Sequence, residues 1–513
     1  MKNKYFYFFL ILAVLPILIF RDYTPDNELR YLSIVDEALR NGNFFTFTNH
    51  GLPYADKPPL YFWIIMFGKA LFGQHQMWFL SLFSFLPALV VVYVMDLWVS
   101  KEVSVENRWL GKIWLMSCGL FLGSAIVLRM DMLMCMFIVL ALYAFYKMYK
   151  GQSGLITWLF PFFIFMAVFS KGPVGFLIPF VSTTVYLLLT NRLSTFIKYW
   201  GWKTWSVLLL GFSIWFLGVY WEGGMPYLNN LVFHQTLDRA VKSFHHEEPF
   251  YYYFISIWYS LAPWAILVIS VIVLGLSRRL MRTDLQKFFS VIILTTLLTM
   301  SLVSAKLSIY LLPTFPFFVY LAVTLMHHFK WNRWLALSLA IPYFVFVTIL
   351  PAFLWLIQQE DGAYLNQSYL YISASLLTVS GLYALYALYR KEISRSVYSL
   401  GIGLFVALFI GGLALPSINH EIGYGELCRK AVSLSEGKQL SGYHVFKIRR
   451  PENMDVYLHE SVKEITQEDL KSLKLQNTLL LLKSGDLLSN KELSEIVLNK
   501  EKYEVGRYMI VVF

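Results

Sequence analysis

Long apolar segments recur from one end of the chain to the other, and they limit its fold more than any other feature. Most are close to the roughly 20 residues that a helix needs to cross a bilayer. Splitting the sequence at charges and at Gly and Pro gives about thirteen candidate spans, near residues 5–20, 76–99, 109–127, 132–148, 155–170, 174–190, 204–221, 251–275, 288–304, 309–326, 334–356, 368–388 and 398–415. Only 15% of the residues are charged, against about 25% in soluble proteins. The sequence therefore predicts an all-α polytopic membrane protein and excludes a soluble enzyme.

The distribution of charge predicts how the chain crosses the membrane. The net charge of +11 arises in the first 417 residues, where basic side chains lie between apolar segments. If the N-terminus is inside, most of these basic side chains fall on the inner side, as the positive-inside rule requires. The first apolar segment ends without a small-residue cleavage site, so we interpret it as a membrane helix rather than a signal peptide. The basic excess is a topology signal, and nucleic-acid binding is set aside.

Two long outer loops are expected, at residues 21–75 and 222–250. In the first, Glu28 to Arg40 has the pattern of an amphipathic helix that ends at Asn41-Gly42. Leu60 to Phe72 is apolar but shorter than a span and ends at Gly73. Both segments suit helices that lie along a membrane surface.

The charge-rich tail, residues 418–513, is expected to be a separate soluble α/β domain. Thr466 to Asp469 reads as a capping box before a short helix, and Ser489-Asn490 can cap another. Segments 477–483 and 503–513 have the pattern of strands. We expect a transmembrane domain over residues 1–417 and this small domain on the outer, periplasmic side.

Charged side chains that break the topological pattern are candidates for function. Arg129, Lys171 and Lys306 each stand alone at the outer end of an apolar segment, which is costly unless the cation meets an anion. The alternative is that each side chain snorkels to the headgroups. With Lys57 and Tyr310, these cations have the chemistry to hold a phosphate. The chain has no Gly-x-x-x-x-Gly-Lys loop and no Asp-x-Asp pair, so we expect the phosphate of a lipid rather than that of a nucleotide.

Carboxylates gather on the same side of the membrane. They include Asp26, Glu28 and Asp56 in the first loop and Asp131 close to Arg129. Acids and bases from several loops on one membrane face suit a reaction at the bilayer surface. A transporter would instead place them near the midplane.

The outer-side motifs resemble a known family. Thr24-Pro-Asp-Asn-Glu-Leu-Arg-Tyr31 and Pro53-Tyr-Ala-Asp-Lys-Pro-Pro-Leu60 resemble the first outer loop of the aminoarabinose transferase and protein O-mannosyltransferase superfamily of GT-C glycosyltransferases. The resemblance continues in chain order through Arg129-Met-Asp131, Ser170-Lys-Gly-Pro173, Arg239, His246-Glu-Glu-Pro-Phe-Tyr-Tyr252 and Ser304-Ala-Lys-Leu-Ser-Ile-Tyr-Leu-Leu-Pro313. It implies the GT-C fold and an inverting transfer of a sugar from a polyprenyl-phosphate donor.

The resemblance also implies which acids take part. The catalytic carboxylate of the family lies in the first outer loop, which points to Asp26 or Glu28. Counting back from Tyr31 places Asn27 at the usual Asp position and Glu28 at the usual Glu position. A one-residue bulge would return Asp26 to the Asp position, and we favour Asp26. Its alternative role is to cap the helix that begins near Glu28. Asp131 matches an acid of the second outer loop, which either orients the acceptor or pairs with a neighbouring arginine.

The remaining matches concern the donor and a metal. By resemblance, Lys57 faces the donor phosphate, and we expect Arg129 and Lys306 to help it stabilise the charge on the leaving phosphate oxygen. Lys306, Tyr310 and Lys171 belong to the lipid-phosphate pocket and its rim. Asp56 stands at a position associated with a divalent metal in some members, with His234 as a candidate second ligand. No cofactor is required beyond this possible metal. Further loop candidates are Arg239 and His246.

The expected function is transfer of a monosaccharide from undecaprenyl phosphate, if the host is bacterial, to an envelope acceptor such as lipid A. The reaction is expected at the outer, periplasmic face of the inner membrane. Expected partners are the lipid-linked donor, a lipid or glycan acceptor and membrane lipids. Two alternatives remain: the same chemistry on a protein or polysaccharide, and a transporter of lipids or glycans.

Overall fold

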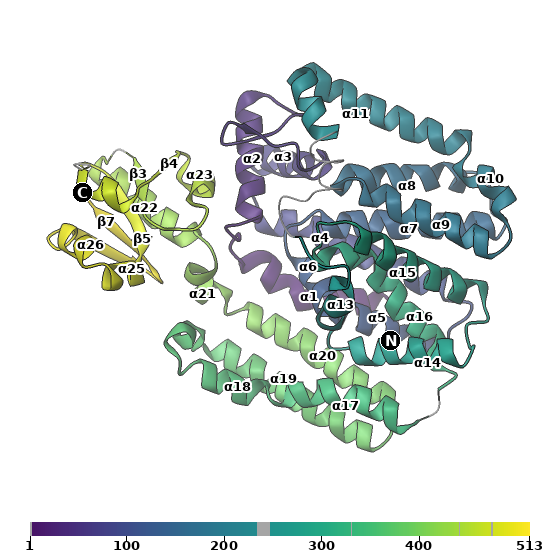
Figure 1. The fold of residues 1–513 in the computed structure, drawn as a ribbon. Coiled ribbons are helices and arrows are strands. Elements are labelled where there is room, and N and C mark those ends of the chain that lie inside the picture. Colours follow the sequence, from purple (N-terminus) through teal and green to yellow (C-terminus); the bar gives the residue numbers. More distant parts are fainter. Residues whose placement is uncertain (1–2, 233–246, 330, 441, 473–475) are drawn as a thin grey trace.

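The computed structural model describes residues 3–232, 247–329, 331–440, 442–472 and 476–513. Most of the chain forms a bundle whose helices lie side by side (Figure 1). The helices of the bundle are α1 (Asn3–Phe20), α4 (Met77–Trp98), α5 (Val105–Ser117), α6 (Gly119–Ile126), α7 (Asp131–Tyr149), α8 (Ile156–Lys171), α9 (Val174–Leu189), η1 (Leu193–Thr195), α10 (Phe196–Trp200), α11 (Trp202–Asn229), α13 (Tyr252–Ser260), α14 (Ala265–Ser277), α15 (Asp284–Leu302), η3 (Ser308–Thr314), α16 (Phe315–Met326), α17 (Arg333–Val347), α18 (Ile349–Leu356), η4 (Glu360–Leu365), α19 (Ser368–Tyr389) and α20 (Ile393–Gly412).

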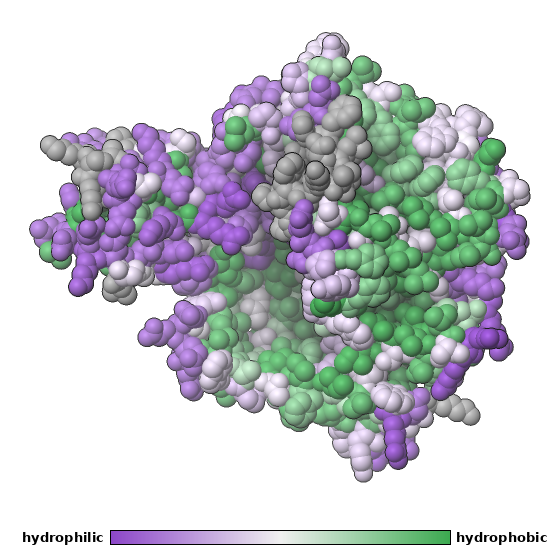
Figure 2. Space-filling view, in the orientation of Figure 1, coloured by the Kyte–Doolittle hydropathy of each residue, from purple (hydrophilic) through white to green (hydrophobic). Residues whose placement is uncertain are grey.

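The helices agree with a polytopic membrane protein. Among the described residues, eight helices are long and apolar enough to cross a membrane, or nine if α5 and α6 form one span bent by 65°. Four further predicted spans correspond to the shorter apolar helices α1, α8, α9 and α14. Figure 2 shows hydrophobic residues over much of the bundle and mainly hydrophilic residues on the small domain beside it.

Four predicted spans are divided between two helical elements: 309–326 into η3 and α16, 334–356 into α17 and α18, and two others at a clear interruption of the helix. The span predicted at 109–127 is broken at Cys118, where the backbone is extended (φ −64°, ψ 126°). The span predicted at 251–275 is two short helices, α13 and α14, with Pro263 in the turn between them. Proline has no backbone N–H to donate and its ring clashes with the preceding turn, so it kinks or breaks a helix. Each of these two segments is a single apolar run in the sequence and was therefore predicted as one helix, whereas the structure has two helices in each.

The first loop has the two predicted helices. They are α2 (Glu28–Asn41) and α3 (Leu60–Phe72), and each ends at a glycine with positive φ, Gly42 at 71° and Gly73 at 74°. A hairpin of β1 (Thr48–Asn49) and β2 (Leu52–Pro53), which the sequence analysis missed, lies between them. We call the end of the bundle that bears α2 the outer end.

A buried ion pair in α2 makes fold stability depend on pH. Asp36 accepts hydrogen bonds from Lys69 Nζ (2.5 Å) and His75 Nε2 (2.7 Å). Burial alone would raise the pKa of the Asp36 carboxyl, but the hydrogen bonds and charges of His75 and Lys69 outweigh burial and hold it below its ordinary value of 3.8. The ionised carboxylate therefore stabilises the fold above about pH 3.8, and this contribution is lost as the pH falls through the lower folded-state pKa.

Replacing Asp36 by Asn is expected to lower the melting temperature at pH 7, because Lys69 and His75 then lose a charged partner. The difference from the unsubstituted protein should shrink as the pH is lowered below 3.8 and through the lower pKa of the folded-state Asp36 carboxyl. Thermal unfolding in detergent across this pH range measures both effects. A difference that stays constant with pH would contradict the assigned role of the carboxylate.

The C-terminal part forms a five-stranded sheet in the order β4-β3-β5-β7-β6. Its elements and the helix that leads into it are α21 (Leu415–Ile422), α22 (Gly425–Lys438), β3 (Tyr443–Val445), η5 (Pro451–Met454), α23 (Asp455–Leu458), β4 (Val462–Glu464), α24 (Gln467–Ser472), β5 (Leu479–Lys483), α25 (Ser484–Ser489), α26 (Lys491–Ile496), β6 (Glu501–Val505) and β7 (Tyr508–Val512). The small α/β domain is confirmed, including the predicted caps at Thr466 and Asn490. The single strand predicted at 503–513 is wrong. It is a hairpin, because Gly506 (φ 56°) and Arg507 form a two-residue turn between β6 and β7.

The C-terminal domain and the first loop share one hydrophobic core. This core includes Leu29 and Val35 of α2, and Leu427, Val445 and Met454 of the domain. α23 of the domain lies against α2 (Figure 1). The first loop is thus packed between the bundle and the domain.

Candidate active site

Glu28, the first residue of α2, is completely buried. Its carboxylate accepts hydrogen bonds from both terminal nitrogens of Arg21 (2.6 Å each), from the Thr24 N–H (2.7 Å) and hydroxyl (2.9 Å), and from the Leu128 N–H (2.8 Å). These five donors fill the hydrogen-bond acceptor sites of the two carboxylate oxygens. Glu28 joins the end of α1 to the first loop and to the segment between α6 and α7.

Asp26 lies in a different environment from Glu28. Its side chain is 43% exposed and pairs with Arg449 Nε at 2.9 Å. The N-cap residue of α2 is Asn27, so Asp26 does not cap the helix. Asn27 instead accepts a hydrogen bond from Arg30 (2.9 Å). Of the two first-loop candidates, only Asp26 has an accessible carboxylate, and this arrangement favours it as the residue that meets a substrate.

Four of the predicted residues come together where α7, α8 and η3 meet. Asp131, at the start of α7, binds Arg129 Nε at 3.0 Å and accepts a hydrogen bond from the ammonium of Lys171 at the end of α8. Lys171 Nζ also lies 4.8 Å from the ring centroid of Tyr310 in η3. The pairing of Asp131 with Arg129 is therefore present. Two cations face one carboxylate, so the cluster carries an excess positive charge that attracts an anion.

The side chains of this cluster differ in how much of their surface is exposed to solvent. The side chain of Asp131 is 2% exposed and that of Arg129 is 29% exposed. The buried Asp131 carboxylate holds the Arg129 and Lys171 side chains in place, and part of the Arg129 side chain stays exposed to solvent. The cluster is thus able to hold an anionic group at the outer end of the bundle.

Arg30 and Tyr31 of α2 complete the surroundings of the cluster, and the sequence analysis missed both as site residues. Burial raises the pKa of the Tyr31 hydroxyl, and the charges of Arg129, Asp131 and Arg30 act on the same group. The Arg30 guanidinium lies 5.8 Å and 5.9 Å from the rings of Tyr31 and Tyr54. Arg30 and Tyr31 both belong to the first-loop motif at residues 24–31, so the motif itself could have identified them as site residues.

The other predicted cations lie in neighbouring loops. Lys306, between α15 and η3, is 4% exposed, and its ammonium donates to the Glu248 carbonyl at 2.7 Å. Lys57 lies just before α3, half-buried, and donates to the Asp56 carbonyl at 3.3 Å. Their predicted contacts with a donor phosphate stay predictions.

The predicted metal site receives no support from the described part of the chain. No group of three or more His, Cys, Asp or Glu side chains that could hold a metal ion occurs among the described residues. Asp56 is therefore not placed in such a group. His234, Arg239 and His246 lie outside the described residues, so their predicted roles are untested.

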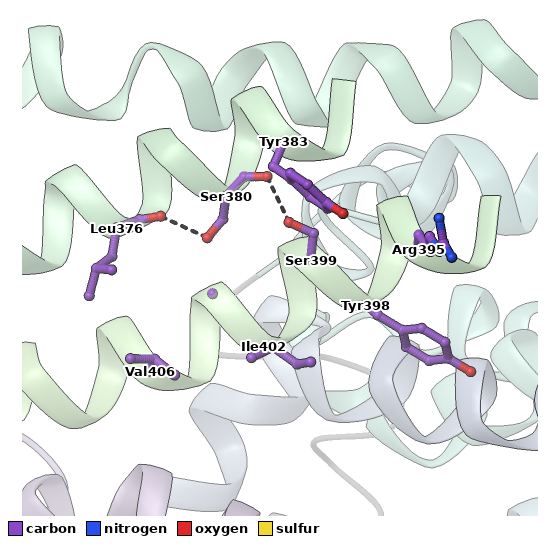
Figure 3. A pocket seen from close by; sticks show the side chains of 9 residues that line it. Leu376, Ser380, Tyr383, Arg395, Tyr398, Ser399, Ile402 and Val406 are labelled. Atoms are coloured by element: carbon purple, nitrogen blue, oxygen red, sulfur yellow. Dashed lines mark hydrogen bonds between the residues drawn. The ribbon is translucent and has the colours of Figure 1, made fainter. Parts of the chain in front are cut away.

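A hollow between α19 and α20 is a weaker candidate for the site. It has a volume of about 490 Å³ and is lined mainly by apolar and hydroxyl side chains, with Arg395 at one end (Figure 3). Arg395 pairs with Glu392 at 2.8 Å. No carboxylate lines the hollow, so it lacks the acid and base that the outer-end cluster provides.

Sequence comparison relates the chain to bacterial sugar transferases. No family model matches it. It is 25% identical over 470 residues to an undecaprenyl phosphate-alpha-4-amino-4-deoxy-L-arabinose arabinosyl transferase of Pseudomonas fluorescens, over 86% of this chain and 80% of the relative. It is 26% identical over 318 residues to an uncharacterized protein of Aquifex aeolicus, over 60% of this chain and 61% of that protein. The chain thus matches less than two thirds of the length of the Aquifex relative.

Structural comparison agrees with the sequence. The crystal structure of ArnT from Cupriavidus metallidurans bound to undecaprenyl phosphate superimposes with a TM-score of 0.75 at 16% identity, covering 100% of this chain and 98% of ArnT. The bundle, the first loop and the small sheet domain therefore define a multi-pass membrane protein of the GT-C fold. In its ordered motifs, its sequence matches and its fold, the chain is similar to the aminoarabinose transferases, as the motifs predicted.

Proposed function

We propose that this protein transfers a monosaccharide from an undecaprenyl-phosphate donor to a lipid A-type acceptor. The observation that carries the proposal is the cluster of Arg129, Asp131, Lys171 and Tyr310, a cationic site at the ends of apolar helices. It occurs in a chain that shares its fold with a protein solved with undecaprenyl phosphate bound. We place the protein in the inner membrane of a bacterium, with the outer end facing the periplasm.

The proposed reaction is a single displacement at the anomeric carbon. The bond from this carbon to the phosphate oxygen breaks while the bond to an acceptor oxygen forms, and the lipid phosphate leaves with the electron pair. Arg129 and Lys171, together with Lys57, stabilise the negative charge that develops on the departing oxygen. A hydroxyl acceptor passes its proton to the Asp26 carboxylate as general base. An ionised phosphate acceptor has no proton to lose, and Asp26 then orients it.

Transfer by the purified protein tests this function. The full chain in detergent is incubated with undecaprenyl-phosphate sugars and lipid A, and mass spectrometry reads the acceptor. The expected result is an added monosaccharide mass that depends on the protein. Envelope glycolipids from cells with and without the protein should differ by the same single sugar.

Two other outcomes would change the proposal. Transfer to a protein or polysaccharide but not to lipid A would keep the chemistry and replace the acceptor. Absence of transfer with all donors, combined with protein-dependent movement of the donor lipid across proteoliposomes, would contradict the enzyme and identify a transporter.

A further inference from the structure

The C-terminal domain holds both ends of the first-loop segment that carries the proposed catalytic carboxylate, residues 22–33. The Asp22 carboxylate accepts a hydrogen bond from the Gly425 N–H at 2.8 Å, between residues 403 positions apart. The Ser33 hydroxyl donates to the Asp455 carboxylate at 2.8 Å, across 422 positions. The segment is thus fixed from the side opposite to the membrane helices.

Asn453 fixes the middle of this segment. It lies in η5, its side chain is 0% exposed, and its Nδ2 donates to the Pro25 carbonyl at 3.0 Å. A buried amide donor is costly unless it is hydrogen-bonded, and the Pro25 carbonyl is the partner of Nδ2, while the buried Oδ1 has no partner among the described residues. The Nδ2 contact holds the backbone immediately before Asp26.

Arg449 holds the side chain of the next residue. Its Nε lies 2.9 Å from Asp26 Oδ1, and its carbonyl accepts a hydrogen bond from the Tyr424 hydroxyl of the same domain. The arginine side chain is 77% exposed, and exposed ion pairs contribute little to stability. The contact places the Arg449 guanidinium directly on the Asp26 carboxylate. Its removal should not unfold the protein.

We propose that the C-terminal domain is a positioning element of the active site, acting through Asn453 and Arg449 on the Pro25-Asp26 turn. Two consecutive residues of the first loop are held by two residues of one short segment of the domain, one through the backbone and one through the side chain. The catalytic part of this inference rests on the proposed transferase function, in which Asp26 is the general base or orients the acceptor.

The test compares Arg449→Ala, Arg449→Lys and Asn453→Ala in the full chain, with Arg450→Ala as the matched control. Arg450 neighbours Arg449 but faces Glu452 of its own domain at 3.6 Å. We expect Arg449→Ala to lower kcat by about two- to fivefold, because an exposed ion pair favours one position of the carboxylate by no more than about this factor. KM for the donor should stay unchanged, since Arg129, Lys171 and Lys57 bind it. Arg449→Lys should restore part of kcat, and Arg450→Ala should match the unsubstituted protein.

Hydrogen exchange provides a readout that does not depend on turnover. Asn453→Ala should speed exchange of the amides in residues 22–33 and leave the membrane helices unchanged. An unchanged exchange rate in this segment would overturn the proposed contact even if the chain proved to have another activity. Equal kcat for Arg449→Ala and Arg450→Ala would overturn the positioning role. Absence of transfer by the unsubstituted protein would count against the proposed function alone.

Discussion

Replacing Lys57 by Ala is expected to lower the rate of sugar transfer by about 10²–10³-fold, the effect of removing one preorganised donor to a developing oxyanion. Lys57 lies half-buried before α3 and is followed by Pro58 and Pro59. Proline rings fix the backbone φ angle, so this loop restrains the backbone that carries Lys57 before the substrate arrives. The loss should appear in kcat more than in the donor KM, because charge on the departing phosphate oxygen grows in the transition state.

The measurement is steady-state transfer from a purified undecaprenyl-phosphate sugar in detergent. Lys198→Ala is a matched control, because Lys198 is an exposed lysine on α10 at the end of the bundle opposite to α2 (Figure 1). The control should retain full activity. If Lys57→Ala turned over as fast as the unsubstituted protein, Lys57 would not be the residue that stabilises the donor phosphate.

Replacing Arg21 by Ala is expected to lower the free energy of unfolding by about 3–5 kcal/mol, the usual cost of removing one partner of a buried ion pair. The Arg21 side chain is 10% exposed and that of Glu28 is 0% exposed. Without the two hydrogen bonds from Arg21, the Glu28 carboxylate is left buried with a charge that only neutral donors satisfy. Denaturant-induced unfolding in detergent, followed by near-UV circular dichroism, measures the loss.

Arg395→Ala is the control for this loss of stability. Arg395 also pairs with a glutamate, but its side chain is 68% exposed, so its removal should change stability little. The double variant Arg21→Ala/Glu28→Gln should recover part of the stability, because the buried charge is then removed as well. An Arg21→Ala protein as stable as the control would show that the pair does not support the first loop.

Much of the fold could be predicted because local signals were strong. The helix at 60–72 was located correctly because Gly73 ends it with a positive φ angle, a signal that lies within the sequence itself. The break at Cys118 could not be predicted, since it lies inside an apolar run and only tertiary packing decides where such a run is interrupted. The hairpin at Gly506 was missed although a glycine followed by Arg507 is a turn signal within the sequence itself.

The site was predictable to a similar extent. Arg129 and Lys171 stood out because an isolated cation at a helix end conflicts with membrane topology, and the structure brings them together on Asp131. The different surroundings of Asp26 and Glu28 could not be predicted. Glu28 is buried by contacts with Leu128, 100 positions away, and Asp26 meets an arginine of the C-terminal domain. No local pattern encodes such distant contacts.

The hydrophobic core that α2 shares with the C-terminal domain has a consequence for biosynthesis. Ribosomes add about 5–20 residues per second, so the roughly 400 residues between Asp22 and Gly425 take about 20–80 s to make. During this interval the apolar face of α2 has left the ribosome while its covering domain does not yet exist. The bilayer surface or a chaperone must shield that face until the last residues of the chain are delivered.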